Sequence, residues 1–259
     1  IIRADGHNVY PKDYIENCVQ CLEQTGADNV GGPWLTVPAD NTLGSRLVAA
    51  MLSNPFGVGD SRFRTGSEEG FVETVPFGAF RREVFDRVGM YNEKLVRNQD
   101  NELNARIRRA GGKIYQTPAL QTTYHPVAGF LQLLKQTYRN SQWHVFSVRE
   151  NAKSMGLRHF APALFVVICA VLIGGAAVSR VAAVLLASLL AGYLLTGWYF
   201  AFTRSKSYGL GLRLLLPLAC FCFHLSYGLG TLAGCRYLLT PPSAKPIRAG
   251  QEVGQDQIA

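Results

Sequence analysis

Two short stretches of the sequence carry side chains that could do chemistry. The first is RNQDNELNARIRRAGGKIY, residues 97–115, in which Asp100 and Glu102 lie among arginines. A helix predicted here places Asp100 in its first turn, where the positive end of the helix dipole favours an ionised carboxylate, as a general base requires. Glu102 points away from Asp100 and can form a surface pair with Arg106 at i+4. The alternative to a general base, on the local sequence alone, is that Asp100 caps the helix or has a structural role.

The second stretch is Asp5-Gly6-His7, which follows an apolar pair of isoleucines. It lies at the carboxyl end of a predicted strand, the edge at which open α/β sheets bind ligands. A carboxylate and an imidazole two residues apart can both turn toward one divalent cation, which could neutralise the charge that develops on a leaving diphosphate. The alternative is a turn-forming aspartate followed by a surface histidine.

The elements that must position these residues alternate between strands and helices. Apolar residues at helical spacing, with proline starts and glycine stops, predict helices over residues 11–25, 42–52 and 98–110, and another that begins near Arg82. Strands are predicted within residues 29–37, before a turn at 76–78, and within 113–118, and a mobile loop is expected over 56–70. This order predicts an α/β layer structure.

The distribution of charge divides the chain in two. The 259 residues have a net charge of +8, yet charged residues almost vanish between Phe160 and Leu239. Membrane-spanning helices are predicted over residues 160–178, 181–202 and 212–232, although the third run could be re-entrant. Basic residues precede the first run and follow the second, which predicts a cytoplasmic soluble part. This basic excess suits anionic membrane lipid better than nucleic acid, so no nucleic-acid partner is expected.

Four segments together resemble the family 2 glycosyltransferases of the GT-A fold: ADGH, YPKDYI, VPFGAFRREVFDRVGMYNE and RNQDNELNARIRRAGGKIYQTP. The likeness extends to bacterial exopolysaccharide glucosyltransferases of the succinoglycan type, which carry a carboxy-terminal membrane anchor. The resemblance implies a partial GT-A (Rossmann-like) domain in which Asp5 and His7 occupy the metal-binding DxD position and hold Mn²⁺ or Mg²⁺. His7 departs from the family's second Asp, and imidazole suits Mn²⁺ better than Mg²⁺.

The resemblance also implies roles for two further motifs. Gln99-Asp100 falls at the family's Glu-Asp pair, so Asp100 would take the proton from an acceptor hydroxyl as that oxygen attacks the anomeric carbon with inversion. Gly78-Ala79-Phe80-Arg81 matches the acceptor-side turn, where glycine lets the backbone approach the sugar and an arginine could contact phosphate. Either Arg81 or Arg82 could face inward.

Residues 127–148 alternate apolar and basic side chains, as in a helix that lies in the membrane interface. Within them, Gln136-x-x-Arg139 and Trp143 partly match the QxxRW element of processive polysaccharide synthases, with Asn140 in place of the adjacent Trp. Either a contact with the acceptor or diphosphate, or interfacial anchoring alone, accounts for this pattern.

Three smaller features lie elsewhere in the chain. In the third apolar run, His224 is expected to donate an interhelical hydrogen bond, and Gly230-x-x-x-Gly234 is expected to allow close helix packing. The Cys18-x-x-Cys21 pair has no second pair to complete a zinc site, so the six cysteines are expected to be reduced and structural.

These features predict four parts: the carboxy-terminal half of a GT-A domain over residues 1–125, an interfacial helix and linker over 126–159, membrane helices over 160–239 and a disordered tail over 240–259. Because the family's nucleoside-binding strands precede the Asp5 position, we expect an amino-terminally truncated fragment that is inactive alone.

The function predicted from the sequence is that of a membrane-anchored inverting glycosyltransferase. It would move a hexose, glucose by the resemblance, from a nucleotide-sugar donor to a polyprenyl-linked saccharide acceptor at the bacterial inner membrane, in exopolysaccharide biosynthesis. Two alternatives stay open: a processive polysaccharide synthase, and a non-catalytic membrane partner with a degenerate transferase domain.

Overall fold

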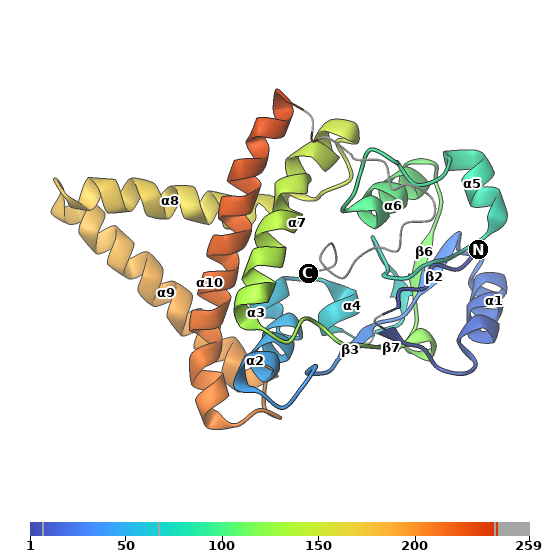
Figure 1. The fold of residues 1–259 in the computed structure, drawn as a ribbon, viewed down its shortest axis with the longest axis horizontal. Helices are drawn as coiled ribbons and strands as arrows, with labels where there is room; N and C mark the ends of the chain where they lie inside the picture. Colours follow the sequence, from blue (N-terminus) through green and yellow to red (C-terminus); the bar gives the residue numbers. More distant parts are fainter. Residues whose placement is uncertain (7, 67, 241, 243–259) are drawn as a thin grey trace.

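The amino-terminal part of the chain is built on a mixed sheet. The structure, a computed structural model, describes residues 1–6, 8–66, 68–240 and 242 (Figure 1). The sheet has the order β4–β6–β2–β5, with strands at Gly70–Phe71 (β4), Ile114–Gln116 (β6), Asn29–Gly31 (β2) and Ala79–Phe80 (β5). β2 and β6 run parallel, and β4 and β5 are antiparallel edges. The predicted α/β architecture is confirmed, and β2 and β6 form the parallel pair of this sheet.

Helices cover both faces of this sheet. Ala79 and Phe80 are neighbours in β5 and therefore point to opposite faces. Ala79 belongs to the apolar cluster under α1 (Tyr14–Thr25), which includes the buried Cys18 and Cys21. Phe80 belongs to the cluster formed with α5 (Arg82–Val88) and α6 (Gln99–Arg109). All six cysteines are free, as expected for reduced structural residues.

A second, three-stranded sheet has the order β1–β7–β3, from Asn8–Val9 (β1), Thr122–Tyr124 (β7) and Trp34–Thr36 (β3). The single strand predicted within residues 29–37 is therefore wrong, because β2 and β3 belong to different sheets. The chain crosses between the sheets at Gly32, where a Cβ would overlap the backbone of Leu120 in the short turn Pro118–Leu120 (η1). His7 and most of the predicted tail over 240–259 lie outside the described residues.

Residues 43–65 join the α/β part to the apolar helices. They form α2 (Leu43–Leu52), α3 (Pro55–Val58) and α4 (Arg62–Thr65), so two short helices replace the loop expected over 56–70. Phe56 packs on Tyr193 and Phe200 of α9, and the Asn54 amide donates to the Phe200 carbonyl at 3.2 Å. These partners lie about 140 residues away in sequence, so local composition gave no sign of the ordering.

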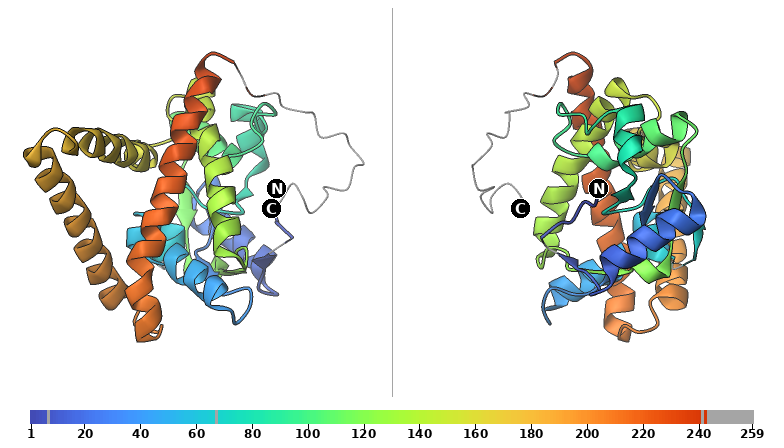
Figure 2. Two further views of the ribbon diagram at one scale, coloured as in Figure 1. Left: turned by 60° about the vertical axis from the view of Figure 1, so that its left-hand side comes forward. Right: turned by 90° about the vertical axis from the view of Figure 1, so that its right-hand side faces the viewer.

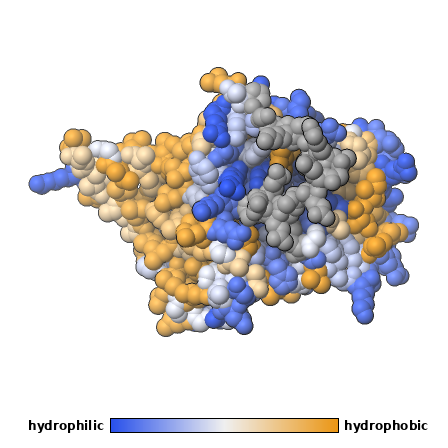
Figure 3. Space-filling view, viewed as in Figure 1, coloured by the Kyte–Doolittle hydropathy of each residue, from blue (hydrophilic) through white to orange (hydrophobic). Residues whose placement is uncertain are grey.

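Three helices are long and apolar enough to cross a membrane: α8 (Ala161–Ala176, preceded by the turn Leu157–Phe160, η2), α9 (Arg180–Arg204) and α10 (Leu210–Gly234, followed by Cys235–Leu238, η3). In Figures 1 and 2, α8 and α9 project from α10 as a hairpin. Only 11% and 6% of their apolar stretches are buried within the protein. Figure 3 shows the apolar surface gathered over this hairpin, which suits contact with lipid.

The helix predicted at the membrane interface, α7 (Phe130–Glu150), packs side by side with α10 (Figures 1 and 2). A Cβ at Gly230 would overlap the Tyr138 carbonyl and the Ser141 hydroxyl, and one at Gly234 would overlap the Gln142 carbonyl. The two glycines therefore let the backbones approach closely, as their spacing predicts.

His224 of α10 connects three helices. The Tyr193 hydroxyl lies 2.7 Å from Nδ1, and Nε2 lies 3.0 Å from the Gly57 carbonyl. Because a carbonyl can only accept, Nε2 donates to Gly57, and in the neutral imidazole Nδ1 then accepts from the Tyr193 hydroxyl. The predicted interhelical donation by His224 is confirmed, and its acceptor is Gly57 of α3.

We expect Gly230→Leu to separate α7 from α10 and to cost about 1–3 kcal/mol of stability, because the new side chain meets backbone atoms that cannot move aside cheaply. The measurement is the thermal unfolding temperature of the purified protein in detergent. Gly192→Leu on α9 is the matched control, because nothing lies within 4 Å of a Cβ there. Equal unfolding temperatures for the two variants would contradict the described packing.

Candidate active site

One arginine joins the two acidic positions that the sequence singled out. The Arg3 guanidinium pairs with Asp5 through Nε, at 3.3 Å from Oδ1, and with Asp100 through Nη1. The two carboxylates are therefore neighbours in space although 95 positions separate them in the sequence. Their side chains are 25% and 39% exposed, so both remain accessible to solvent and to a ligand.

The Arg3–Asp5 segment is held in place by the turn before β5. The Arg3 amide donates to the Gly78 carbonyl at 3.1 Å, and the Phe80 amide donates to the Ile1 carbonyl at 2.7 Å. Beyond it, the Asp5 amide donates to the Tyr10 hydroxyl at 2.8 Å. Backbone hydrogen bonds thus fix the approach of Arg3 and Asp5 to α6.

Asp100 lies in the first turn of α6, as predicted, and α6 is fixed to the sheet by buried amides. The Asn29 amide of β2 donates to Asn104 Oδ1 at 2.8 Å, and the Asn104 amide donates to Thr74 Oγ1 at 2.7 Å. Both asparagines are at most 2% exposed. Since a buried polar group is costly unless it is paired, this chain of bonds determines where α6 lies on the sheet.

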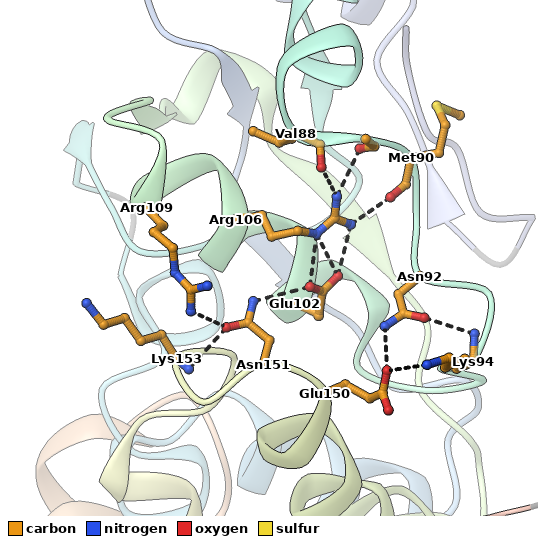
Figure 4. A network of polar contacts seen from close by, with 11 residues as sticks. Val88, Met90, Asn92, Lys94, Glu102, Arg106, Arg109, Glu150, Asn151 and Lys153 are labelled. Carbon is orange, nitrogen blue, oxygen red and sulfur yellow. Dashed lines mark hydrogen bonds and ion pairs between the residues drawn. The ribbon is translucent and has the colours of Figure 1, made fainter.

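A second set of contacts fixes the other side of α6 (Figure 4). Arg106 pairs with Glu102 at 2.9 Å and donates to the carbonyls of Val88, Gly89 and Met90 at the end of α5. The Asn151 amide, at the end of α7, donates to Glu102 at 3.2 Å. The predicted Glu102–Arg106 pair exists, but it is not a surface pair, because the Glu102 side chain is only 4% exposed. It ties α6 to α5 and α7.

The surroundings of Asp100 act on its pKa in opposite directions. Partial burial raises the pKa of Asp100 above its ordinary value, the Arg3 guanidinium lowers it, and the neighbouring Asp5 carboxylate raises it again. The net direction is upward. A raised pKa increases the affinity of Asp100 for a proton, and the fixed Arg3 cation favours its ionised form before the proton arrives. A general base requires both properties.

The QxxR element of α7 lies close to the start of α6. Arg97 donates to Asn140 Oδ1, and burial together with repulsion from Arg139 lowers the pKa of Arg97. Gln136 and Asn140 line the same cavity as Asn98 and Asn101, which flank Asp100 in sequence. Trp143 lies apart from them, in edge contact with Phe146 and near Tyr237.

The remaining predicted contact residues have partners within the fold. A Cβ at Gly78 would overlap the Asn29 side chain, and Ala79 pairs with Val30 across β5 and β2. Phe80 is buried between α5 and α6, Arg81 donates to the carbonyls of Leu22 and Ala27, and Gln99 donates to that of Leu95. Arg82 is exposed on α5. Contacts of Gly78, Ala79, Phe80, Arg81 and Gln99 with a donor or acceptor stay predictions.

The described residues, taken alone, do not fit a divalent cation. Among them, no group of three His, Cys, Asp or Glu side chains could hold one, and Arg3 already pairs with both carboxylates. His7, the other predicted ligand, lies outside the described residues. Metal binding at Asp5 and His7 therefore stays a prediction.

Arg3 and Asn29 were not among the residues predicted from the sequence. A basic residue two positions before Asp5 was a signal for the first, because Arg3 and Asp5 lie on the same side of an extended chain. Asn29 gave no signal, since its partner Asn104 is 75 positions away.

No protein-family model matches the chain. Over 166 residues it is 31% identical to the succinoglycan biosynthesis protein ExoA of Rhizobium meliloti (strain 1021), a match that covers 62% of this chain and 48% of that protein. The chain thus spans about half the length of the curated relative it matches.

Proposed function

We propose that the chain belongs to a membrane-anchored inverting glycosyltransferase that moves a hexose from a nucleotide sugar to a lipid-linked saccharide in exopolysaccharide biosynthesis. Similarity to a succinoglycan biosynthesis protein supports the pathway class. The three long apolar helices support membrane association. The sequence segments that resemble a GT-A domain support the reaction type.

The observation that carries the proposal is the shared contact of Arg3 with Asp5 and Asp100. In the proposed reaction, the Asp100 carboxylate takes the proton of an acceptor hydroxyl while that oxygen attacks the anomeric carbon. The bond from this carbon to the nucleoside diphosphate breaks, and the diphosphate leaves with the electron pair. Arg3 favours the ionised state of Asp100 before the transfer, because its guanidinium stabilises the carboxylate.

We favour the addition of a single hexose over processive synthesis of a polymer. With so little of α8 and α9 buried, the membrane helices within the described residues offer surface to lipid rather than walls to a polymer channel. Asn140, in the position of the QxxRW tryptophan, is bonded to Arg97 of the α/β part. A non-catalytic partner would not need accessible carboxylates, whereas the side chains of Asp5 and Asp100 are both accessible to solvent.

The test is transfer by membranes that contain the protein expressed from its complete reading frame. Labelled nucleotide hexoses are supplied with a lipid-linked saccharide extract, and the lipid products are separated by length. The proposal expects one added hexose for each acceptor and the release of one nucleoside diphosphate. A long polymer from one donor would favour the processive synthase, and no release with any nucleotide hexose would favour the non-catalytic partner.

A further inference from the structure

A cavity of about 640 Å³ lies between the α/β part and the apolar helices. Leu133, Phe165 and Phe223 contribute its apolar lining from α7, α8 and α10. Asn98 and Asn101 contribute polar lining from the start of α6, on either side of the proposed base. The cavity therefore reaches from the apolar helices to the start of α6, beside the proposed base, and its volume is typical of a ligand site.

The charged lining of this cavity is entirely basic. Its described lining residues include Arg64 and Arg158 but no Asp or Glu. Arg158 is already compensated, since it pairs with Asp60 at 3.0 Å and with Glu73 at 2.9 Å. His144 adds no charge, because burial, with a smaller effect of His159, lowers its pKa to about 3. The uncompensated cation of the cavity is Arg64.

Arg64 is held by aromatic rings rather than by a carboxylate. Its guanidinium carbon lies 4.4 Å from the ring centre of Trp34, 5.4 Å from that of Phe63 and 5.6 Å from that of Tyr124. None of the ion pairs among the described residues includes Arg64, and its Nη1 atom is buried without a hydrogen-bond partner. Burial lowers the pKa of Arg64.

A half-buried cation whose Nη1 donor is buried and unused is costly unless an anion completes it. The faces of aromatic rings stabilise a guanidinium, but they accept no ordinary N–H hydrogen bond, and the side-chain hydrogen bond of Arg64 with Tyr124 leaves Nη1 without a partner. A phosphate stabilises the charge of a guanidinium and also accepts its N–H hydrogen bonds, because its oxygens are negatively charged and match the spacing of two parallel N–H donors. The apolar lining beside Arg64 favours a phosphate that carries an apolar chain.

We propose that Arg64 binds the phosphate of a polyprenyl-linked acceptor whose chain leaves the cavity along α7, α8 and α10. This inference rests on the proposed function, and it adds the residue and the cavity that seat the acceptor. The saccharide on the phosphate then extends toward Asn98 and Asn101, next to Asp100. Arg64 is a binding residue in this account, and Asp100 remains the base.

The test measures binding, so it does not depend on sugar transfer. The purified protein from the complete reading frame is placed in phosphatidylcholine nanodiscs, which carry no net lipid charge, with undecaprenyl phosphate or with undecaprenol. We expect the phosphate to bind more tightly than the alcohol, and Arg64→Gln to weaken phosphate binding at least about tenfold, as for loss of a charged hydrogen bond. Arg62→Gln, an exposed arginine on the same helix, should leave binding unchanged.

Two further measurements distinguish a role of Arg64 in binding the donor from a role in binding the lipid. Uridine diphosphate binding is measured in the same variants: if Arg64→Gln weakens it and spares undecaprenyl phosphate, Arg64 serves the donor and the inference fails. If Arg64→Gln does not fold, Arg64→Lys is measured instead. It keeps the charge but lacks the two parallel N–H donors of a guanidinium, so we expect weaker lipid binding than in the unmodified protein. Unchanged lipid binding in a folded Arg64 variant overturns the inference. Arg64-dependent binding without any transfer would instead refute the proposed function alone.

Discussion

Replacing Asp100 with Asn should lower sugar transfer by about 10²–10⁴-fold and leave donor binding nearly unchanged. A general base contributes a factor of this size, and an amide cannot accept the proton of the acceptor hydroxyl. The amide is close in shape to the carboxylate and can still accept a hydrogen bond from Arg3, so the local fold should persist. The measurement is the single-turnover transfer rate, with donor affinity determined in parallel.

The matched control is Asp86→Asn, which changes an exposed aspartate on α5. It should transfer at the unmodified rate. Near-normal transfer by Asp100→Asn would remove this residue from the mechanism and leave its capping or structural role as the explanation.

Replacing Glu102 with Ala should destabilise the protein by about 3–5 kcal/mol, as expected when one partner of a buried ion pair is removed. The change leaves the Asn151 amide without its acceptor and Arg106 without its carboxylate (Figure 4). Because this pair fixes α6, the variant should also transfer sugar more slowly, even at temperatures where it stays folded. The measurement is the free energy of unfolding in detergent.

Two variants bracket this prediction. Glu102→Gln retains an acceptor for Asn151 and should lose less stability than Glu102→Ala. Glu83→Ala removes an exposed carboxylate on α5 and should change stability by less than about 0.5 kcal/mol. If Glu102→Ala were as mild as Glu83→Ala, the pair would not hold α6 in place.

The elements that could be predicted are those whose own sequence specifies them. The apolar runs predicted over 160–178, 181–202 and 212–232 correspond to α8, α9 and α10, because length and lack of charge are local properties. The helix predicted over 98–110 corresponds to α6, with Asp100 in its first turn. The close packing at Gly230 and Gly234 also followed from spacing alone.

The features that could not be predicted depend on partners far away in the chain. Residues 56–70 look mobile by composition, yet contacts of Phe56 with α9 order the α3 segment. Glu102 looks exposed by helical spacing, but it is buried against Arg106, which is bonded to the carbonyls after α5, and against Asn151 at the end of α7. Arg64 lies in the segment expected to be a mobile loop, yet the rings of Trp34 and Tyr124 lie around its guanidinium. In each case tertiary contacts override the local pattern.

In the proposed mechanism, an ionised Asp100, paired with Arg3, accepts the proton of the acceptor hydroxyl during transfer. The most direct measurement is the pH dependence of the single-turnover rate in the unmodified protein and in Arg3→Met, with Arg108→Met, an exposed arginine on α6, as control. Arg3 lowers the pKa of Asp100, so its removal should raise that pKa and move the acid limb of the rate profile to higher pH. The control should keep the limb in place. An acid limb that stays at the same pH in Arg3→Met would contradict the claim.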